Sequence, residues 1–343
     1  ENGNDTLIFI GGNNQVQGNG GNDLILGAGL ANQVQGNAGN DIALLAGLVQ
    51  NLDLGAGDDI GLTLGAYSNL LGGDGQDALY AIGLANTVLA GNGNDFLYAA
   101  GVGNFLWGQA GNDVFLSQGM AMQALLSNKQ LNDGTAVINF ALNTLSLVAQ
   151  GIASETVPNK LSDYANQKAV GVTTAMGGDG NDTFFSGAQA TIADGGNGQD
   201  TYHFYLGDGS FTIQDSGLET NQLIIHTEAI RQYGAAFDVS ASDFFYNTQN
   251  KTLSIVHAGQ NYGDIVLRDF ENANNAIVWQ KADGSRSHLD LSRLTAVNNT
   301  AEVNNHWVPT STLSVPNGSE TFALTTLYDD FSKTLSATGV ILA

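Results

Sequence analysis

The chain has no cysteine, so a disulfide framework is excluded. Basic residues are also scarce: 10 Lys and Arg stand against 33 Asp and Glu, and none precedes Lys129. The net charge of −23 makes nucleic acid and anionic membranes poor partners. No apolar run of about 18 residues could span a bilayer, and the N-terminal stretch does not read as a signal peptide. An exported protein of this composition would need another source of stability, such as bound metal.

What the chain does contain is a repeat with a period of 18 residues. It places aspartate at Asp5, Asp23, Asp41, Asp59, Asp77, Asp95 and Asp113, and a glycine two residues before each one. Glycines in phase with an acid indicate tight turns, and the short apolar runs between them have the length of strands. A fixed period over seven copies is typical of a repeat architecture. We therefore predict a mainly β fold, a parallel β-roll or β-solenoid in which one repeat forms one coil.

The two turns of each coil differ in charge. One ends in the repeat aspartate, and the opposite turn, nine residues later, carries Asn, Gln or Ser, as at Asn14, Gln50 and Ser68. All the carboxylates should therefore line one edge, about 4.8 Å apart. At an effective dielectric of about 20, neighbouring charges would repel by roughly 3 kcal/mol per pair. Carboxylates together with backbone carbonyls form an all-oxygen site, which suits Ca²⁺. Good turn formation by Asp is the plainer alternative.

The acidic turns resemble the glycine-rich nonapeptide G-G-x-G-x-D of RTX (repeats-in-toxin) proteins, as in Gly72 to Asp77 and Gly177 to Asp182. The 18-residue unit is most similar to the C-terminal repeats of multifunctional-autoprocessing RTX (MARTX) toxins. Leu54 and Ala90 depart from the pattern by replacing the first turn glycine.

The resemblance implies about 6 to 9 Ca²⁺ ions in one column. The implied side-chain ligands are the seven repeat aspartates with Asp182 and Asp200, and the implied turn glycines are Gly21, Gly39, Gly57, Gly75, Gly93, Gly111, Gly180 and Gly198. Asp208 and Asp215 are candidates for the last ion, and a plain turn is the alternative for both.

The residues one and three positions after each repeat aspartate are predicted to face outward, and they are mostly apolar, as at Ile42, Leu44, Phe96 and Tyr98. Monomers rarely expose large apolar patches. We expect this strip to be covered by a later segment or to form a contact surface.

The period defines the predicted divisions of the chain. They are a β-roll at 1–119, a helical insertion at 120–175, a resumed β-roll at 176–210, a β-rich cap at 211–294 and a C-terminal type I secretion signal at 295–343. The cap is expected because an open solenoid end presents unpaired strand edges. The chain begins within a turn, so we expect it to be the C-terminal part of a longer protein.

The sequence contains no pattern typical of an enzyme. Its 5 histidines are scattered, and Asp215-Ser216-Gly217 occurs once where an acid dyad needs two copies. The resemblance implies a secreted, extracellular toxin module that folds on Ca²⁺ outside the cell. Its expected partners are the type I secretion machinery, through the C-terminus, and the host cell surface or membrane. The alternatives are the RTX region of a giant adhesin and the export module of a secreted enzyme.

Overall fold

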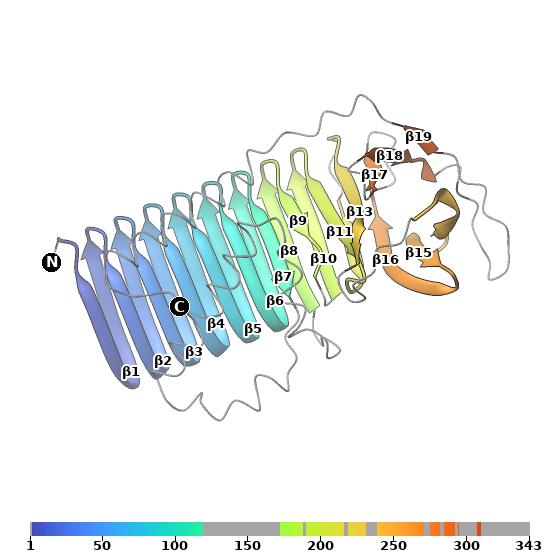
Figure 1. Cartoon of the computed structure of the whole chain (residues 1–343). Coiled ribbons are helices and arrows are strands. Elements are labelled where there is room, and N and C mark those ends of the chain that lie inside the picture. The colour runs from blue at the N-terminus through green and yellow to red at the C-terminus, as the bar shows by residue number, and fades with distance from the viewer. Residues whose placement is uncertain are drawn as a thin grey trace.

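The computed structural model describes residues 2–118, 172–187, 190–215, 219–230, 239–270, 275–281, 285–291, 294 and 307–309. These residues form strands and turns almost throughout, and the only helical element among them is the 3₁₀ turn η2 (Ala241–Asp243). Within these ranges no helix has the length and hydropathy needed to cross a membrane. The predicted β-solenoid is confirmed, and it forms an elongated stack in Figure 1.

The first six coils are each one strand of 15 residues. They are β1 (Thr6–Gly20), β2 (Leu24–Ala38), β3 (Ile42–Ala56), β4 (Ile60–Asp74), β5 (Ala78–Asn92) and β6 (Phe96–Ala110). Each pairs in parallel with the next at a register of 18 residues, as in Leu24 with Ile42. The strand continues through the turn opposite the acids, where the sequence predicted an interruption. Only the acidic turn breaks the hydrogen-bonded ladder.

The long segment after the seventh acidic turn enters without breaking the stack. β7 (Val114–Gln118) and β8 (Val172–Asp179) pair with the two halves of β6, so together they complete one coil. The inserted residues therefore leave at the turn opposite the acids. β8 begins at Val172, four residues before the predicted start of the resumed roll at 176. The rest of the predicted helical insertion lies outside the described residues.

Later coils are shorter, and they lead into the cap. The strands are β9 (Thr183–Phe185), β10 (Ala190–Asn197), β11 (Thr201–Leu206), β12 (Phe211–Gln214), β13 (Gln222–Ile230), β14 (Phe244–Asn247), β15 (Thr252–His257), β16 (Gln260–Arg268), β17 (Ala276–Gln280), β18 (Arg286–Leu289) and β19 (Trp307–Pro309). β16 and β17 are the last strands added in parallel, on β12 and β13.

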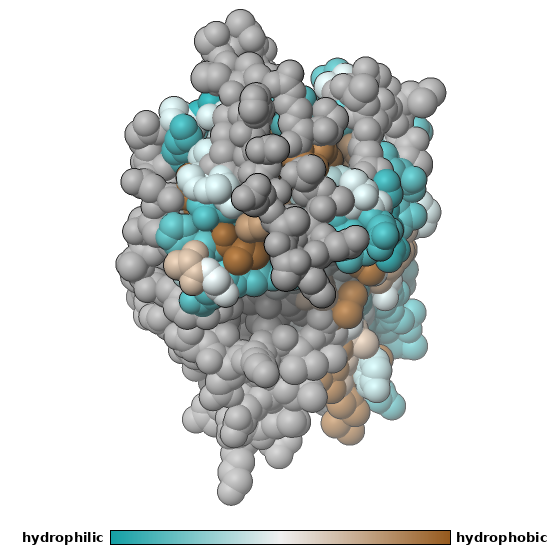
Figure 2. All heavy atoms as spheres, turned by 90° about the vertical axis from the view of Figure 1, so that its right-hand side faces the viewer, coloured by the Kyte–Doolittle hydropathy of each residue, from teal (hydrophilic) through white to brown (hydrophobic). Residues whose placement is uncertain are grey.

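Beyond them, pairing turns antiparallel in β16–β15–β14 and in β17–β18–β19. This reversal ends the stack, because a further coil cannot continue the same parallel register. The predicted β-rich cap is thus confirmed. Figure 2 views the molecule from this end and shows hydrophilic side chains with small apolar groups among them. The predicted secretion signal at 295–343 lies outside the described residues apart from β19.

The interior is a narrow core built from the second residue after each aspartate. Ile25, Leu79 and Leu97 are fully buried. Toward the cap the row becomes aromatic, with Phe115 stacked on Phe184 at a ring distance of 4.6 Å. Gly61 leaves a gap in this row, and Leu54 fills it, since its Cδ1 lies 3.0 Å from where a Gly61 Cβ would stand. Leu54 thus serves the core instead of the turn.

The outward apolar strip is buried from the second coil to the seventh. Ile42, Leu44, Phe96 and Tyr98 belong to a second apolar cluster that, among the described residues, draws only on this side of the coils. In the first coil the matching residue Ile8 is 69% exposed. The expectation that the strip would not be bare therefore holds for coils two to seven.

Close stacking makes the glycines six residues after each aspartate sensitive to any side chain. A Cβ on Gly47 would lie 1.7 Å from the carbonyl oxygen of Gly29, whereas a Cβ on Gly12 would meet nothing within 4 Å. We expect Gly47→Ala to lower the free energy of unfolding by roughly 3 kcal/mol, because the coils must separate to admit the methyl group. Gly12→Ala is the matched control and should change it by less than about 0.5 kcal/mol. Urea unfolding measures both, and equal stabilities for the two variants would contradict the predicted stacking.

Candidate metal centre along the acidic turns

The structure brings the repeat aspartates into one column. The backbone N–H of each donates to the Oδ1 atom of the aspartate in the next coil, over 2.6 to 2.9 Å, from Asp5 through Asp200. The contact between Asp113 and Asp182 spans the inserted segment without a change of geometry. One carboxylate oxygen of each residue after Asp5 therefore has a structural partner.

The column continues into the cap with two residues that the sequence did not reveal. Asp200 N–H donates to Asn221 Oδ1 at 2.7 Å, and Asn221 N–H donates to Asn275 Oδ1 at 3.0 Å. Each asparagine directly precedes a strand, which was the available signal. Their spacing, 21 and 54 residues, departs from the period of 18, so the repeat could not identify them.

The second oxygen of each aspartate has no partner. Oδ2 is buried and accepts no hydrogen bond in Asp23, Asp41, Asp59, Asp77, Asp95, Asp113, Asp182 and Asp200. All eight residues are at most 3% exposed. A buried unpaired acceptor costs about 1 to 3 kcal/mol, and a charged one costs more. Each site therefore requires a proton or a cation at Oδ2.

The chain itself contains a comparison that separates the roles of the two oxygens. The residue before each aspartate also accepts a backbone hydrogen bond, as when Asn22 N–H donates to Asn4 Oδ1 and Gln76 N–H donates to Asp58 Oδ1. There Asn, Asp and Gln all occur. Asn221 likewise fills the column position without a charge. Accepting one hydrogen bond thus needs no carboxylate, so the nine aspartates are explained only by a use of Oδ2.

Beside most of these oxygens lies a space, which we call a cradle, at the glycine five residues earlier. A Cβ on Gly36 would lie 2.3 Å from Asp41 Oδ2 and 2.4 Å from the carbonyl oxygen of Leu54 in the next coil. The same conflict with Oδ2, at 2.0 to 2.3 Å, occurs at Gly18, Gly36, Gly72, Gly108, Gly177 and Gly195. Only glycine fits there, and its absent side chain leaves two oxygens facing one point.

Two coils lack this space. Leu54 and Ala90 occupy the position in the coils of Asp59 and Asp95, where their Cβ atoms take up room that glycine leaves open. Six complete cradles remain. Departures that the sequence already suggested thus have a direct spatial meaning.

The second glycine predicted for each turn, two residues before the aspartate, shapes the backbone. Its φ lies between 111° and 143° at Gly21, Gly39, Gly57, Gly75, Gly93, Gly111, Gly180 and Gly198. At Gly39 a Cβ would also lie 2.2 Å from the Gly21 carbonyl oxygen. These residues form the turn and keep the coils in contact.

Burial dominates the electrostatics of the column. It raises the pKa of Asp41 to about 6, of Asp59 to about 7 and of Asp77 to about 8, from a usual value of 3.8. The backbone hydrogen bond lowers each pKa in part, and neighbouring carboxylates raise it again. Asp182 behaves in the same way, with a pKa of about 8. The bare column is therefore a poor place for charge near neutral pH.

The structure separates the two extra acids proposed for the last ion. Asp215 is fully buried and accepts a hydrogen bond from Tyr202 Oη at 2.7 Å, and its charge contributes to raising the pKa of Asp200. Asp208 follows the other end of β11 and accepts a hydrogen bond from Ser186, so the length of an extended strand separates it from Asp200. Asp208 is therefore not brought to the last acidic turn.

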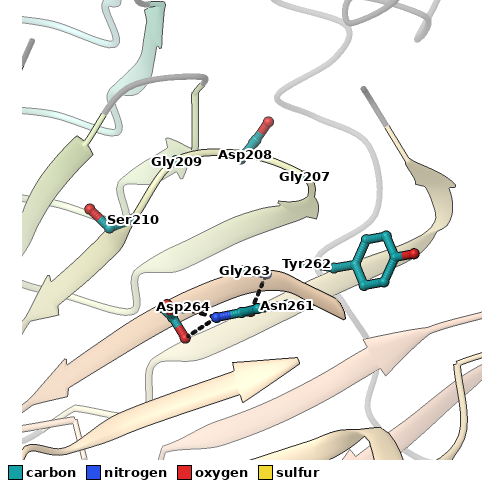
Figure 3. Close-up of a pocket in the computed structure, with 8 residues that line it drawn as sticks. All are labelled: Gly207, Asp208, Gly209, Ser210, Asn261, Tyr262, Gly263 and Asp264. Carbon is teal, nitrogen blue, oxygen red and sulfur yellow. Dashed lines mark hydrogen bonds between the residues drawn. The ribbon is translucent and has the colours of Figure 1, made fainter. Parts of the chain in front are cut away.

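Asp208 instead lines a separate cavity of about 280 Å³, drawn in Figure 3, between the loops 207–210 and 261–264. Asp264 in the facing loop accepts from Asn261 Nδ2 at 3.0 Å and from Ser254 Oγ at 2.5 Å. Side-chain hydrogen bonds thus hold both acids of this cavity.

The opposite turn carries a neutral ladder. Asn14 Nδ2 donates to Asn32 Oδ1, and Asn86 Nδ2 donates to Asn104 Oδ1, both at 2.8 Å. Amides satisfy one another there, so the acidic edge alone has a deficit of positive charge. Across the described ranges no three acidic or histidine side chains gather to bind a metal by themselves. A cation on the acidic edge would need backbone carbonyl oxygens as well.

No protein-family model matches this chain, and no curated protein sequence matches it. Its relation to RTX proteins therefore rests on the turn residues and the coil geometry.

The raised pKa values predict how stability depends on pH when no metal is bound. Folded carboxyls with pKa values of about 6 to 8 bind protons more tightly than unfolded ones near 3.8. Stability from this source is complete below about pH 4 and is lost as pH rises through about 6 to 8. Each carboxyl contributes at most about 1.4 kcal/mol per pH unit. Urea unfolding in chelator between pH 5 and pH 8.5 measures it, and a flat or rising profile would contradict the prediction.

Proposed function

We propose that this chain is a calcium-binding RTX module of a large secreted bacterial toxin. In this proposal it folds when Ca²⁺ binds outside the cell, which drives type I secretion, and the folded module supports engagement of the host cell. It has no catalytic role of its own. The observation that carries the proposal is the row of eight buried aspartates whose Oδ2 atoms have no partner.

A hard divalent cation fits the cradles better than a proton alone. A proton on Oδ2 would neutralise the charge but would also create a new donor that needs its own acceptor. Ca²⁺ takes six to eight oxygens, including backbone carbonyls, at flexible geometry. The cradle at Gly36 offers Asp41 Oδ2 from one coil and the Leu54 carbonyl oxygen from the next. An ion bound there would join neighbouring coils.

The charge of the chain supports a folding switch. With a net charge of −23, the column is stacked against its own repulsion. Six divalent ions would supply about +12 and offset roughly half of that excess. Because such sites exist only in the folded stack, the free energy of metal binding becomes free energy of folding. Low calcium inside a cell would leave the chain unfolded for export, and high calcium outside would fold it.

The toxin is preferred as the parent protein because the 18-residue unit with alternate acidic and amide turns is most similar to MARTX repeats. An adhesin or a secreted enzyme would use the same calcium chemistry. Binding of the purified module to host cells, with inert surfaces as the control, separates the toxin from an export module that has no such target.

Calcium-dependent folding is the direct test of this function. At pH 8 we expect far-UV circular dichroism to report a largely unfolded chain in chelator and a β-rich chain at millimolar Ca²⁺, while Mg²⁺ is much less effective. A chain that is equally β-rich with and without chelator at this pH would refute the proposal. At pH 5 protonated carboxyls should partly replace the metal, so the calcium effect should shrink.

A matched pair of substitutions isolates the role of Oδ2. Asp77→Asn keeps the acceptor for the Asp59 N–H and removes the charge, whereas Asp58→Asn removes a charge from the exposed neighbouring position. We expect the first variant to bind about one fewer calcium ion and to melt lower in saturating calcium, yet to be more stable than wild type in chelator at pH 8. The second should keep the wild-type stoichiometry. Isothermal titration calorimetry and thermal unfolding give both readings, and identical behaviour of the two variants would sink the assignment.

A further inference from the structure

The last acidic turn differs from the other cradles. At Gly195 a Cβ would lie 2.0 Å from Asp200 Oδ2, as in the repeat, but its next side-chain neighbour is Tyr202 Oη at 2.6 Å. In the other five cradles the corresponding atom is a carbonyl oxygen of the following coil. The stack therefore ends in a site of different composition.

Additional carboxylates gather at this end. Asp215 follows β12, whose Ile213 is in register with Ala193, so Asp215 comes level with Gly195. Tyr202 Oη donates to Asp215 Oδ2 at 2.7 Å and holds that side chain beside the cradle. Glu219 has a buried Oε2 atom with no hydrogen-bond partner. Asp200 itself is 1% exposed, and its Oδ2 atom is also without a partner.

The electrostatic interactions agree with this placement. Burial, and then the charges of Asp215 and Glu219, raise the pKa of Asp200 to about 7 after the opposing effect of its backbone hydrogen bond. Asp194 adds a further negative charge nearby. Among the interactions resolved for Asp200, none comes from a Lys or Arg. Three carboxylates thus surround a position where a repeat cradle has one.

We infer that the last acidic turn is a separate, tighter site for a divalent cation, in which Glu219 and Asp215 add their charges to that of Asp200. The inference rests on the proposed calcium-binding function and extends it. More carboxylates per site raise affinity for Ca²⁺. This site fills first as calcium rises, and the stack then orders from the cap toward the N-terminal coils.

Terbium luminescence tests the inference on the full chain, because Tb³⁺ replaces Ca²⁺ and is sensitised by a tyrosine a few ångströms away. We expect tyrosine-sensitised emission to saturate before calorimetry reports full occupancy. Tyr202→Phe should remove most of the emission while the ion count stays within one of wild type. Glu219→Gln should raise the Tb³⁺ concentration for half-maximal emission about tenfold. Glu219→Asp, which keeps the charge, should recover most of that loss.

Asp53→Asn is the control for loss of one charge outside the column, and it should leave the emission curve unchanged. Circular dichroism at saturating calcium verifies that each variant is folded. An unchanged emission curve for Glu219→Gln would overturn this inference alone, provided that Asp77→Asn still loses an ion. Absence of any metal binding by the wild-type chain would instead overturn the proposed function.

Discussion

The structure depends on what satisfies the second carboxylate oxygen of each repeat aspartate. The first oxygen is part of the β-stack, because it accepts the backbone N–H of the preceding coil, as between Asp59 and Asp77. Stacking the coils therefore buries the second oxygen in the same step. Its charge cannot be screened by water there, so the folded stack is coupled to whatever binds it. Each coil adds a further site of the same kind, which makes the coupling cumulative.

Glycine has two separate functions in this arrangement. At the position of Gly36 it leaves space for oxygens of two coils to approach one point, and at the position of Gly39 it supplies the left-handed backbone of the turn. Leu54 shows the effect of losing the first function, since its side chain repairs the core gap at Gly61. The sequence of one coil thus trades a cradle for packing.

Much of the fold could be predicted because the period carried it. The 18-residue register, the single acidic edge and the buried second residue after each aspartate all follow from repeated spacing. Asn221 and Asn275 could not be found in this way, because irregular cap strands separate them from Asp200. Asp208 was grouped with the last turn on sequence distance alone, and the length of β11 places it at the other edge. A period predicts what repeats, and the ends of the stack do not repeat.

The same distinction explains why the two ends of the acidic column differ chemically. Inside the stack every cradle faces another coil and shares that coil's carbonyl oxygen. At the cap no further coil of this kind follows, and side chains of Tyr202, Asp215 and Glu219 stand near Asp200 instead. Anomalous scattering from a crystal grown in calcium tests the central claim most directly. The account predicts about six peaks along the acidic edge, each touching an aspartate Oδ2. An edge without peaks, in a folded and calcium-saturated crystal, would contradict it.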